Sequence, residues 1–211
     1  MAEEEPFDTP IEGRAGVARV EAFSDGVLAI IVTIMVLEMH APDAPGLAAL
    51  LHLWPTMIAY VLSYSFVAIY WVNHHRLFSY ATVVTNGLLW SNIALLFALS
   101  LVPFSTSYLG KHNFSLDATL LYLVTMLFPA CVYHFLQDGI RRNGNQSRAA
   151  KTYHTATMRK GFAAGLVYTA GIPLSYVSPW LGIGCVALVA LFWILPWSPL
   201  DRLFLGGDGT R

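Results

Sequence analysis

The stretch that decides the fold runs from Arg19 to His40 and reads RVEAFSDGVLAIIVTIMVLEMH. It is predominantly apolar and has the ~20 residues that a helix needs to cross the hydrocarbon layer of a membrane. Its few ionisable side chains lie towards its two ends, with Asp25 the deepest of those at the start and Glu38 near the end. The stretch therefore predicts the first of several membrane-spanning helices.

The whole chain shares this apolar character. Of its 211 residues, 56% are hydrophobic and only 12% are charged, and the mean hydropathy is +0.56. A soluble domain carries about 25% charged residues, so this chain has too few to cover a compact body in water. Disordered chains are poor in apolar residues, which excludes that class too. A net charge of -1 gives no general attraction to nucleic acid. We expect an integral membrane protein.

Six stretches are long and apolar enough to cross the bilayer. They are residues 17–39, 48–72, 87–109, 116–138, 161–178 and 180–197. Ser178 and Pro179 alone separate the last two, which predicts a tight hairpin because Pro ends one helix and suits the first turn of the next. One long broken helix, giving five spans, is the alternative, but 37 residues are too many for one crossing. We expect one all-α domain over 1–211, with a short N-terminal segment (1–16) and a C-terminal tail (198–211).

The basic residues predict the orientation, because cytoplasmic loops are enriched in Lys and Arg. With six spans, eleven of the twelve basic residues fall on the side of the N-terminus, and Lys111 is the exception. Five spans would place the tail on the other side and weaken this asymmetry. We therefore expect both termini in the cytoplasm and the chain in the plasma membrane.

Asp25 is the charged side chain of the first span that most needs partners. It lies at least one turn deeper than Glu21, and a charge inside the membrane is costly unless it is paired. Donors are available near the cytoplasmic ends of the second and third spans. They are Trp71, Asn73, His74, His75, Arg76, Asn86 and Asn92. We expect a network that joins a histidine to Asp25 or Arg19, which would make the protein sensitive to pH. Adjacent histidines do not have metal-ligand spacing, so we expect no metal site.

Helical spacing places Phe23, Ile30, Ile34 and Leu37 on one stripe of the first span, with Thr33 at its edge. Asp25 points about 140° away from Ile30 and thus away from whatever the stripe faces. Spacing alone fits two interpretations of the stripe, contact with a neighbouring helix or the wall of a pore, and it favours the first.

The first span resembles the signature helix of the transmembrane protein 175 family, the potassium-permeable channels of endosomes and lysosomes. The resemblance rests on Arg19-x-x-x-Phe23-Ser24-Asp25, followed by GVLAIIVTIMVLEM. It continues through YWVNHHRLF (70–78) and NGLLWSNIALLFALSLVPFSTSYLG (86–110). Animal members have two six-span repeats and prokaryotic relatives have one, so this chain is similar to the prokaryotic type.

The resemblance implies a homotetramer in which four first helices line a central pore for K⁺, with no resident cofactor. The family's principal constriction maps to Ile30, further apolar rings map to Ile34 and Leu37, and a pore-facing hydroxyl maps to Thr33. Arg19, Ser24 and Asp25 would hold the inner helix ends together. Rings of this kind can gate by dewetting. The family lacks the Thr-Val-Gly-Tyr-Gly filter of ordinary potassium channels, as does this sequence, which implies only modest selectivity for K⁺ over Na⁺.

A secondary transporter that uses Asp25 and the nearby histidines as a proton relay is the rival prediction. Carriers usually have internal repeats and helices broken at mid-membrane, whereas the first span has neither a proline nor a break. A non-conducting membrane scaffold is a third possibility. The sequence has no nucleophile–base pair, P-loop or dinucleotide fingerprint, so we expect no enzyme.

Overall fold

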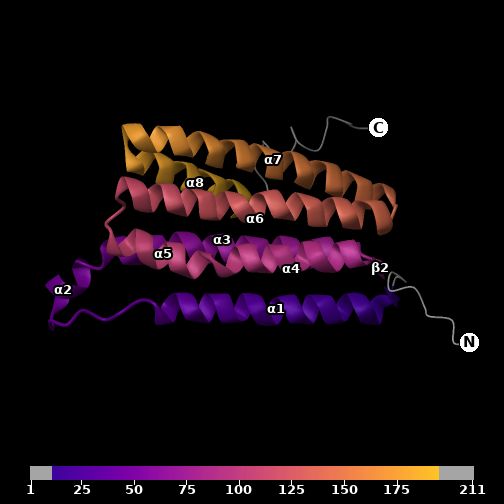
Figure 1. The fold of residues 1–211 in the computed structure, drawn as a ribbon, viewed down its shortest axis with the longest axis horizontal. Helices are drawn as coiled ribbons and strands as arrows, with labels where there is room; N and C mark the ends of the chain where they lie inside the picture. Colours follow the sequence, from indigo (N-terminus) through magenta and orange to yellow (C-terminus); the bar gives the residue numbers. More distant parts are fainter. Residues whose placement is uncertain (1–10, 195–211) are drawn as a thin grey trace, which may run out of the picture.

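The computed structural model describes residues 11–194, and almost all of them are helical (Figure 1). The helices are α1 (Arg14–Leu37), α2 (Leu47–Leu51), α3 (Trp54–Phe78), α4 (Asn86–Ser100), α5 (Val102–Lys111), α6 (Leu116–Asn143), α7 (Arg148–Val177) and α8 (Pro179–Ile194). Two short strands, β1 (Ile11–Glu12) and β2 (Val83–Val84), pair in antiparallel fashion with Ile11 opposite Val84. The predicted tail (198–211) and the first ten residues of the predicted N-terminal segment lie outside the described residues.

Four helical segments within residues 11–194 are long and apolar enough to cross a membrane. They are α1, α3, α4 together with α5, and α6. The apolar helix α8 is shorter, at 16 residues. Helix α7 has 30 residues, but it begins with a polar segment that carries Arg148, Lys151, Arg159 and Lys160. The prediction of an all-helical membrane protein is confirmed at this level.

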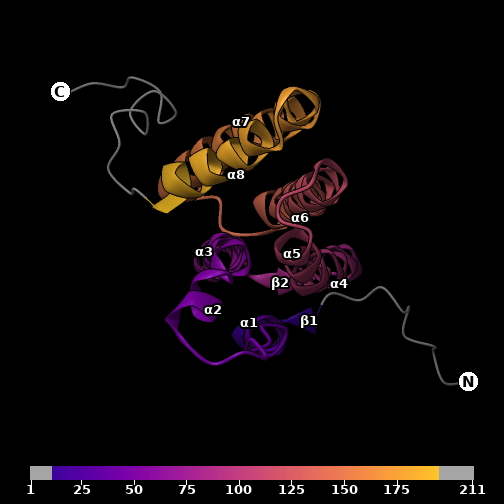
Figure 2. The same cartoon turned by 90° about the vertical axis from the view of Figure 1, so that its left-hand side faces the viewer.

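The last two helices form the predicted hairpin and not one broken helix. Helix α7 ends at Val177 and α8 begins at Pro179, so Ser178 alone connects them. Ser178 is in an extended conformation (φ -159°, ψ 128°), and its carbonyl accepts a hydrogen bond from the amide of Leu181 at 3.0 Å. The two helices then pack against each other side by side (Figures 1 and 2).

The predicted third span is interrupted at Leu101, between α4 and α5. Pro103 explains the interruption, because it has no N–H for the carbonyl of Leu99 and its ring crowds the preceding turn. Helix α5 then approaches α3 very closely: a Cβ atom at Gly110 would lie 2.8 Å from the Cα of Thr56. Only glycine fits there without moving the backbone. The predicted span over 87–109 is confirmed as one apolar segment, Asn86–Lys111, with the interruption at Leu101 inside it.

The helices form a bundle with α1 at one edge and the α7–α8 hairpin at the other (Figure 2). Helix α6 lies between them and packs on α4, α5, α7 and α8. Its residues Tyr122, Leu123, Met126 and Leu136 are completely buried. Helix α1 packs on α3, α4 and α5. The edge position of α1 leaves its other side uncovered in the single chain.

Candidate functional site

Helix α1 has a covered face and an uncovered face. Its buried residues are Val17, Ser24, Leu28, Ile31 and Met35. The apolar stripe predicted from helical spacing lies on the uncovered face. Phe23 is 60% exposed, Ile30 58%, Ile34 42% and Leu37 76%, and Thr33 is exposed beside them. Within the single chain, the stripe is therefore not used for packing.

A chain of buried hydrogen bonds holds the covered face of α1 near its N-terminal end. The Ser24 hydroxyl donates to the carbonyl of Val20 at 2.8 Å and accepts from Nδ2 of Asn92 at 2.9 Å. The Asn92 amide oxygen lies 2.9 Å from Nε2 of His74. Because this oxygen only accepts, the proton of neutral His74 is on Nε2. Since all three side chains are buried, the bonds link α1, α4 and α3 without help from water.

Two further polar pairs join α1 to α3 beside this chain. The indole Nε1 of Trp71 donates to Oδ1 of Asp25 at 3.0 Å, and Nδ1 of His75 lies 2.6 Å from Oε1 of Glu21. Glu21 and Asp25 are one turn apart on α1, and their partners His75 and Trp71 are one turn apart on α3. The two pairs therefore form neighbouring cross-links between the same two helices. The rings of Trp71 and His75 also stack, with centroids 6.4 Å apart.

The partners differ in part from the expected ones. Asp25 contacts a tryptophan and not a histidine, while His74 reaches α1 through Asn92 and Ser24. Glu21, one turn before Asp25 on α1, is partly buried and pairs with His75. The sequence held a signal for this second pair: Glu21 and Asp25 are four residues apart, which is also the spacing of Trp71 and His75.

Arg19 lies apart from this cluster. It is exposed and makes no hydrogen bond or ion pair with the described part of its own chain. Because Arg19 and Ile30 are eleven residues apart, their directions on the helix differ by only about 20°. Arg19 thus lies on the same uncovered side as the stripe and not beside Asp25.

At the opposite end of α1, a groove separates α1 from α5. It has a volume of about 450 Å³, and its lining includes Ile30, Ile34 and Phe104. The groove ends at Glu38 and Lys111, whose charged atoms are 4.0 Å apart. Next to the groove, the Thr33 hydroxyl donates to the carbonyl of Ile30 at 2.8 Å, so its lone pairs remain available to a ligand.

The cluster near Asp25 is suited to holding helices together and not to holding a metal ion. Its carboxylates and imidazoles lie in separate pairs, and no three His, Cys, Asp or Glu side chains among residues 11–194 are placed to bind one metal. What the geometry provides is a helix fixed on one face and free on the other.

The sequence of this region matches a known protein family. Residues 19–103 match the family model described as endosomal/lysosomal potassium channel TMEM175. This segment contains nearly all of α1, together with α3 and α4, and thus every polar pair described above for Ser24, Asp25 and Glu21.

Relatives with this sequence pattern occur in bacteria and animals. A protein of Chryseobacterium sp. (strain P1-3), named a potassium channel, is 40% identical over 185 residues, which cover 87% of this chain and 95% of the relative. A protein of Streptomyces collinus, also named a potassium channel, is 34% identical over 83% of this chain and 90% of the relative. The human relative is named an endosomal/lysosomal proton channel, and 34% identity to it extends over only 33% of this chain and 16% of that protein.

The fold is also similar to a solved structure. A TMEM175 homologue from Chamaesiphon minutus, described as a lysosomal potassium-selective channel homologue, superposes with a TM-score of 0.78. The match has 28% sequence identity and covers 86% of this chain and 98% of the other. Sequence and fold therefore agree over nearly the full length of the bacterial relatives.

Proposed function

Because the chain belongs to the TMEM175 family, we propose that it is a potassium channel that conducts K⁺ passively through a pore lined by α1. The observation that carries this proposal is the stripe of Phe23, Ile30, Ile34 and Leu37, which is apolar and uncovered although the opposite face of the same helix is tied to α3 and α4. Among residues 11–194 of a single chain, the stripe is exposed and is not enclosed by other helices. Several copies that meet at α1 would form one.

The assembly that fits best is a homotetramer with four copies of α1 at its centre. The position of α1 at one edge of the bundle, opposite the α7–α8 hairpin, supports this arrangement (Figure 2). Arg19 lies on the uncovered side, so in an assembly it faces neighbouring copies and its charge finds partners there. Native mass spectrometry of the purified protein tests the tetramer, and a monomer with full ion flux would contradict it.

We also propose six membrane crossings with both termini in the cytoplasm. The start of α1, the end of α3 and the α6–α7 connection lie at one end of the bundle, and α2 lies at the other (Figure 1). Apart from Lys111, the basic residues in the described part of the chain lie in these segments or in the adjoining first half of α7, which is the pattern of a cytoplasmic surface. The bacterial relatives support a location in a prokaryotic plasma membrane.

The pore is narrowed by apolar rings, with Ile30 as the main constriction and Ile34 and Leu37 beyond it. Water leaves a narrow apolar neck readily, so the closed state needs no plug. Opening requires α1 to rotate or splay, which widens the ring and brings the Thr33 oxygen to the passing ion. With one hydroxyl per chain in place of a carbonyl filter, we expect modest discrimination between K⁺ and Na⁺.

A proton-coupled carrier is less consistent with the positions of the titratable groups. Glu21 and Asp25 contact α3 and not the stripe. Between Asp25 and Glu38, α1 has no titratable side chain, so no relay of such groups continues along it. The animal relatives are named proton channels, so proton flux belongs in the test.

The test is ion flux from liposomes that contain the purified protein. Under a K⁺ gradient we expect passive K⁺ efflux that exceeds Na⁺ efflux and does not need a proton gradient. Ile30→Asn should raise the leak and lower the selectivity, because a polar ring keeps the neck hydrated. Val36→Asn is the matched control, since Val36 is 45% exposed but lies about 120° away from Ile30 on α1.

Two results would reject this proposal. In the first, Ile30→Asn and Val36→Asn change flux equally, which removes the role of the stripe. In the second, Ile30→Asn leaves flux unchanged while Asp25→Asn abolishes uptake that depends on a proton gradient, which replaces the channel with the carrier.

A further inference from the structure

The α6–α7 connection packs tightly on the short segment that joins α3 to β2. The backbone amide of Asn145 donates to the carbonyl of Tyr80 at 2.8 Å, and the Thr82 hydroxyl donates to the carbonyl of Asn143 at 3.1 Å. A Cβ atom at Gly144 would overlap the carbonyl oxygen of Tyr80, so the two backbones are in direct contact. We refer to the two segments together as the junction, which comprises residues 79–82 and 143–154.

A buried histidine fills the inside of the junction. His154, near the start of α7, is only 1% exposed, and its ring centroid lies 5.6 Å from that of Tyr80 and 5.5 Å from that of Tyr153. Its backbone carbonyl accepts a hydrogen bond from Nε2 of Gln137 at 3.1 Å. Neither ring nitrogen has a hydrogen-bond partner within residues 11–194. Because a protonated ring has two N–H donors and a charge to satisfy, this site accepts the neutral ring and opposes the charged one.

The charged groups around His154 also oppose its protonation. Arg141 of α6 is the cation that faces it from the neighbouring helix. Asp138 does not supply a counter-charge, because it is already bound to Arg141, with Oδ1 3.0 Å from Nε, and to Arg142. The two tyrosine rings of the junction carry no charge near neutral pH. Burial therefore lowers the pKa of the His154 imidazole, and the charge of Arg141 lowers it further.

The direction of the pH effect follows from this lowered pKa. When the junction opens and water reaches the ring, His154 regains the ordinary imidazole pKa of about 6.5. The closed junction thus binds fewer protons than the open one. Its stability is fully present above about pH 6.5 and is lost as the pH falls below that value.

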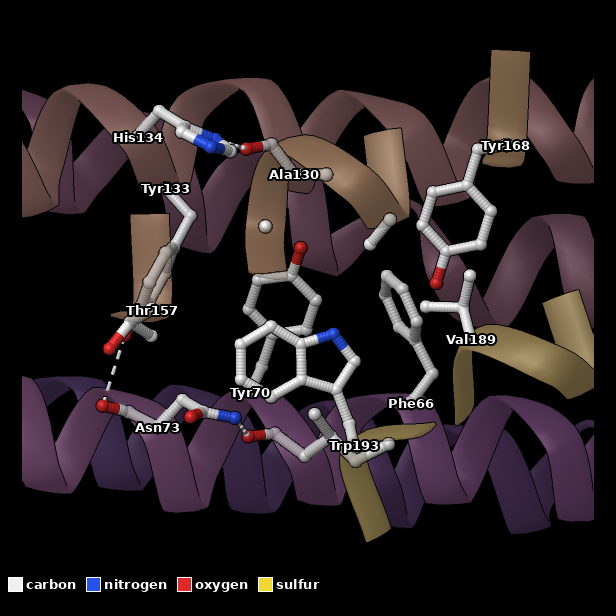
Figure 3. Close-up of a pocket in the computed structure, with 13 residues that line it drawn as sticks. Phe66, Tyr70, Asn73, Ala130, Tyr133, His134, Thr157, Tyr168, Val189 and Trp193 are labelled. Carbon is white, nitrogen blue, oxygen red and sulfur yellow. Dashed lines mark hydrogen bonds between the residues drawn. The ribbon is translucent and has the colours of Figure 1, made fainter. Parts of the chain in front are cut away.

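The deeper part of α7 is held by other contacts. Thr157, three residues after His154, and Gly161 line a small pocket between α3, α6, α7 and α8 (Figure 3). In the same view, the Tyr133 hydroxyl of α6 donates to the carbonyl of Asn73 on α3 at 3.0 Å. These contacts do not involve the His154 ring, so the junction can open while the rest of α7 stays packed in the bundle.

We propose that His154 is a proton sensor whose protonation opens the junction and releases the first turns of α7 from the α3–β2 segment. In the proposed orientation, the sensor responds to the pH of the cytoplasm. Because β2 directly follows the junction segment and pairs with β1 just before α1, the junction is connected to the start of α1. His154 is distinct from His74 and His75, which lie on α3 and pair with Asn92 and Glu21. Opening of the junction does not depend on ion conduction, so the inference stands or falls separately from the channel activity.

Hydrogen–deuterium exchange of the purified full-length protein in detergent tests the junction directly, because protected amides exchange through local opening. Protection is compared at about pH 7.5 and about pH 5, after correction for the intrinsic exchange rate. For the amides of residues 145–154 we expect protection to fall about tenfold at the lower pH. His154→Phe should abolish this fall, since a phenyl ring keeps the aromatic contacts but takes up no proton. At the higher pH the variant should be at least as well protected, because it removes two buried nitrogens that have no partner.

Two control variants make the test specific. His52→Phe is the matched control, because His52 is exposed beside α2 at the other end of the bundle, and it should retain the full fall. Asp138→Asn should retain the fall too, since its pairing with Arg141 is not the sensor. His154→Leu provides the same comparison if His154→Phe does not yield folded protein. An equal fall in the unmodified protein and in a folded His154 variant would overturn the proposal, and so would a fall that disappears in Asp138→Asn.

Discussion

The two faces of α1 are equally apolar in sequence but have opposite surroundings. Leu28, Ile31 and Met35 are 1–3% exposed and pack on the other helices, whereas Ile30 is 58% exposed and Leu37 76%. Ile30 and Ile31 are adjacent, so residue type does not distinguish them. The difference teaches that hydrophobicity alone does not determine packing in this helix: one face packs inside the subunit, and the other is uncovered in the single chain, as the proposed pore requires.

The largest difference between the two faces is expected when Ile31 and Ile30 are each replaced by alanine in separate variants. Ile31→Ala should lower the free energy of unfolding by about 2–5 kcal/mol, because it leaves a cavity among packed side chains. Ile30→Ala should leave the fold of the subunit nearly unchanged and increase ion leak. Thermal unfolding in detergent and liposome flux measure the two effects. Equal losses of stability would show that both residues pack inside the subunit.

A smaller effect is expected from the buried hydrogen bonds that hold the covered face. Asn92→Leu leaves the buried Nε2–H of His74 without its acceptor, which costs about 1–3 kcal/mol, whereas the Ser24 hydroxyl still donates to the carbonyl of Val20. Thermal unfolding again provides the measurement. Asn143→Leu, at the exposed end of α6, is the control and should change stability by at most about 0.5 kcal/mol. Similar results for the two variants would mean that this hydrogen-bond chain does not stabilise α1.

The smallest effect is expected at the partly exposed pair of Trp71 and Asp25. Trp71→Phe keeps an aromatic ring beside His75 but removes the indole N–H, so we expect a loss of about 0.5–1.5 kcal/mol. Trp71 is 48% exposed and water can replace part of the bond, which favours the lower value. Trp90→Phe, at a residue that is 71% exposed on α4, provides the matched comparison by thermal unfolding. A loss as large as that from Asn92→Leu would show that the pair is less accessible to water than the single chain indicates.

Much of the fold could be predicted from the sequence because hydrophobic length and proline positions act locally. The α7–α8 hairpin follows from Ser178 and Pro179, and the membrane class follows from the scarcity of charge. The break at Leu101 was missed although its cause, Pro103, is visible in the sequence. The surrounding run is apolar throughout, and a proline in such a run is compatible with a kinked but continuous helix.

The site was predicted only in part, because the partners of a side chain depend on helix register. Spacing identified the stripe that contains Ile30, and the sequence named Trp71, His74 and Asn92 as candidate partners. It did not identify which donor meets Asp25, because a rotation of α3 by one residue, about 100°, would exchange them. The pairing of Glu21 with His75 depends on the same rotation.

Helix α7 is longer than the hydrocarbon layer of the membrane is thick. Its 30 residues extend over about 45 Å, whereas the hydrocarbon layer is only about 30 Å thick. With the hairpin end at one membrane surface, the first ten or so residues must stand in water, and these include the exposed Arg148 and Lys151. In the proposed six-crossing arrangement, α7 therefore carries both a soluble outer section and a lipid-embedded inner section. A tilt of the buried part would displace the soluble part in the opposite direction, so a label on the first turn of α7 would report movements deep in the bilayer.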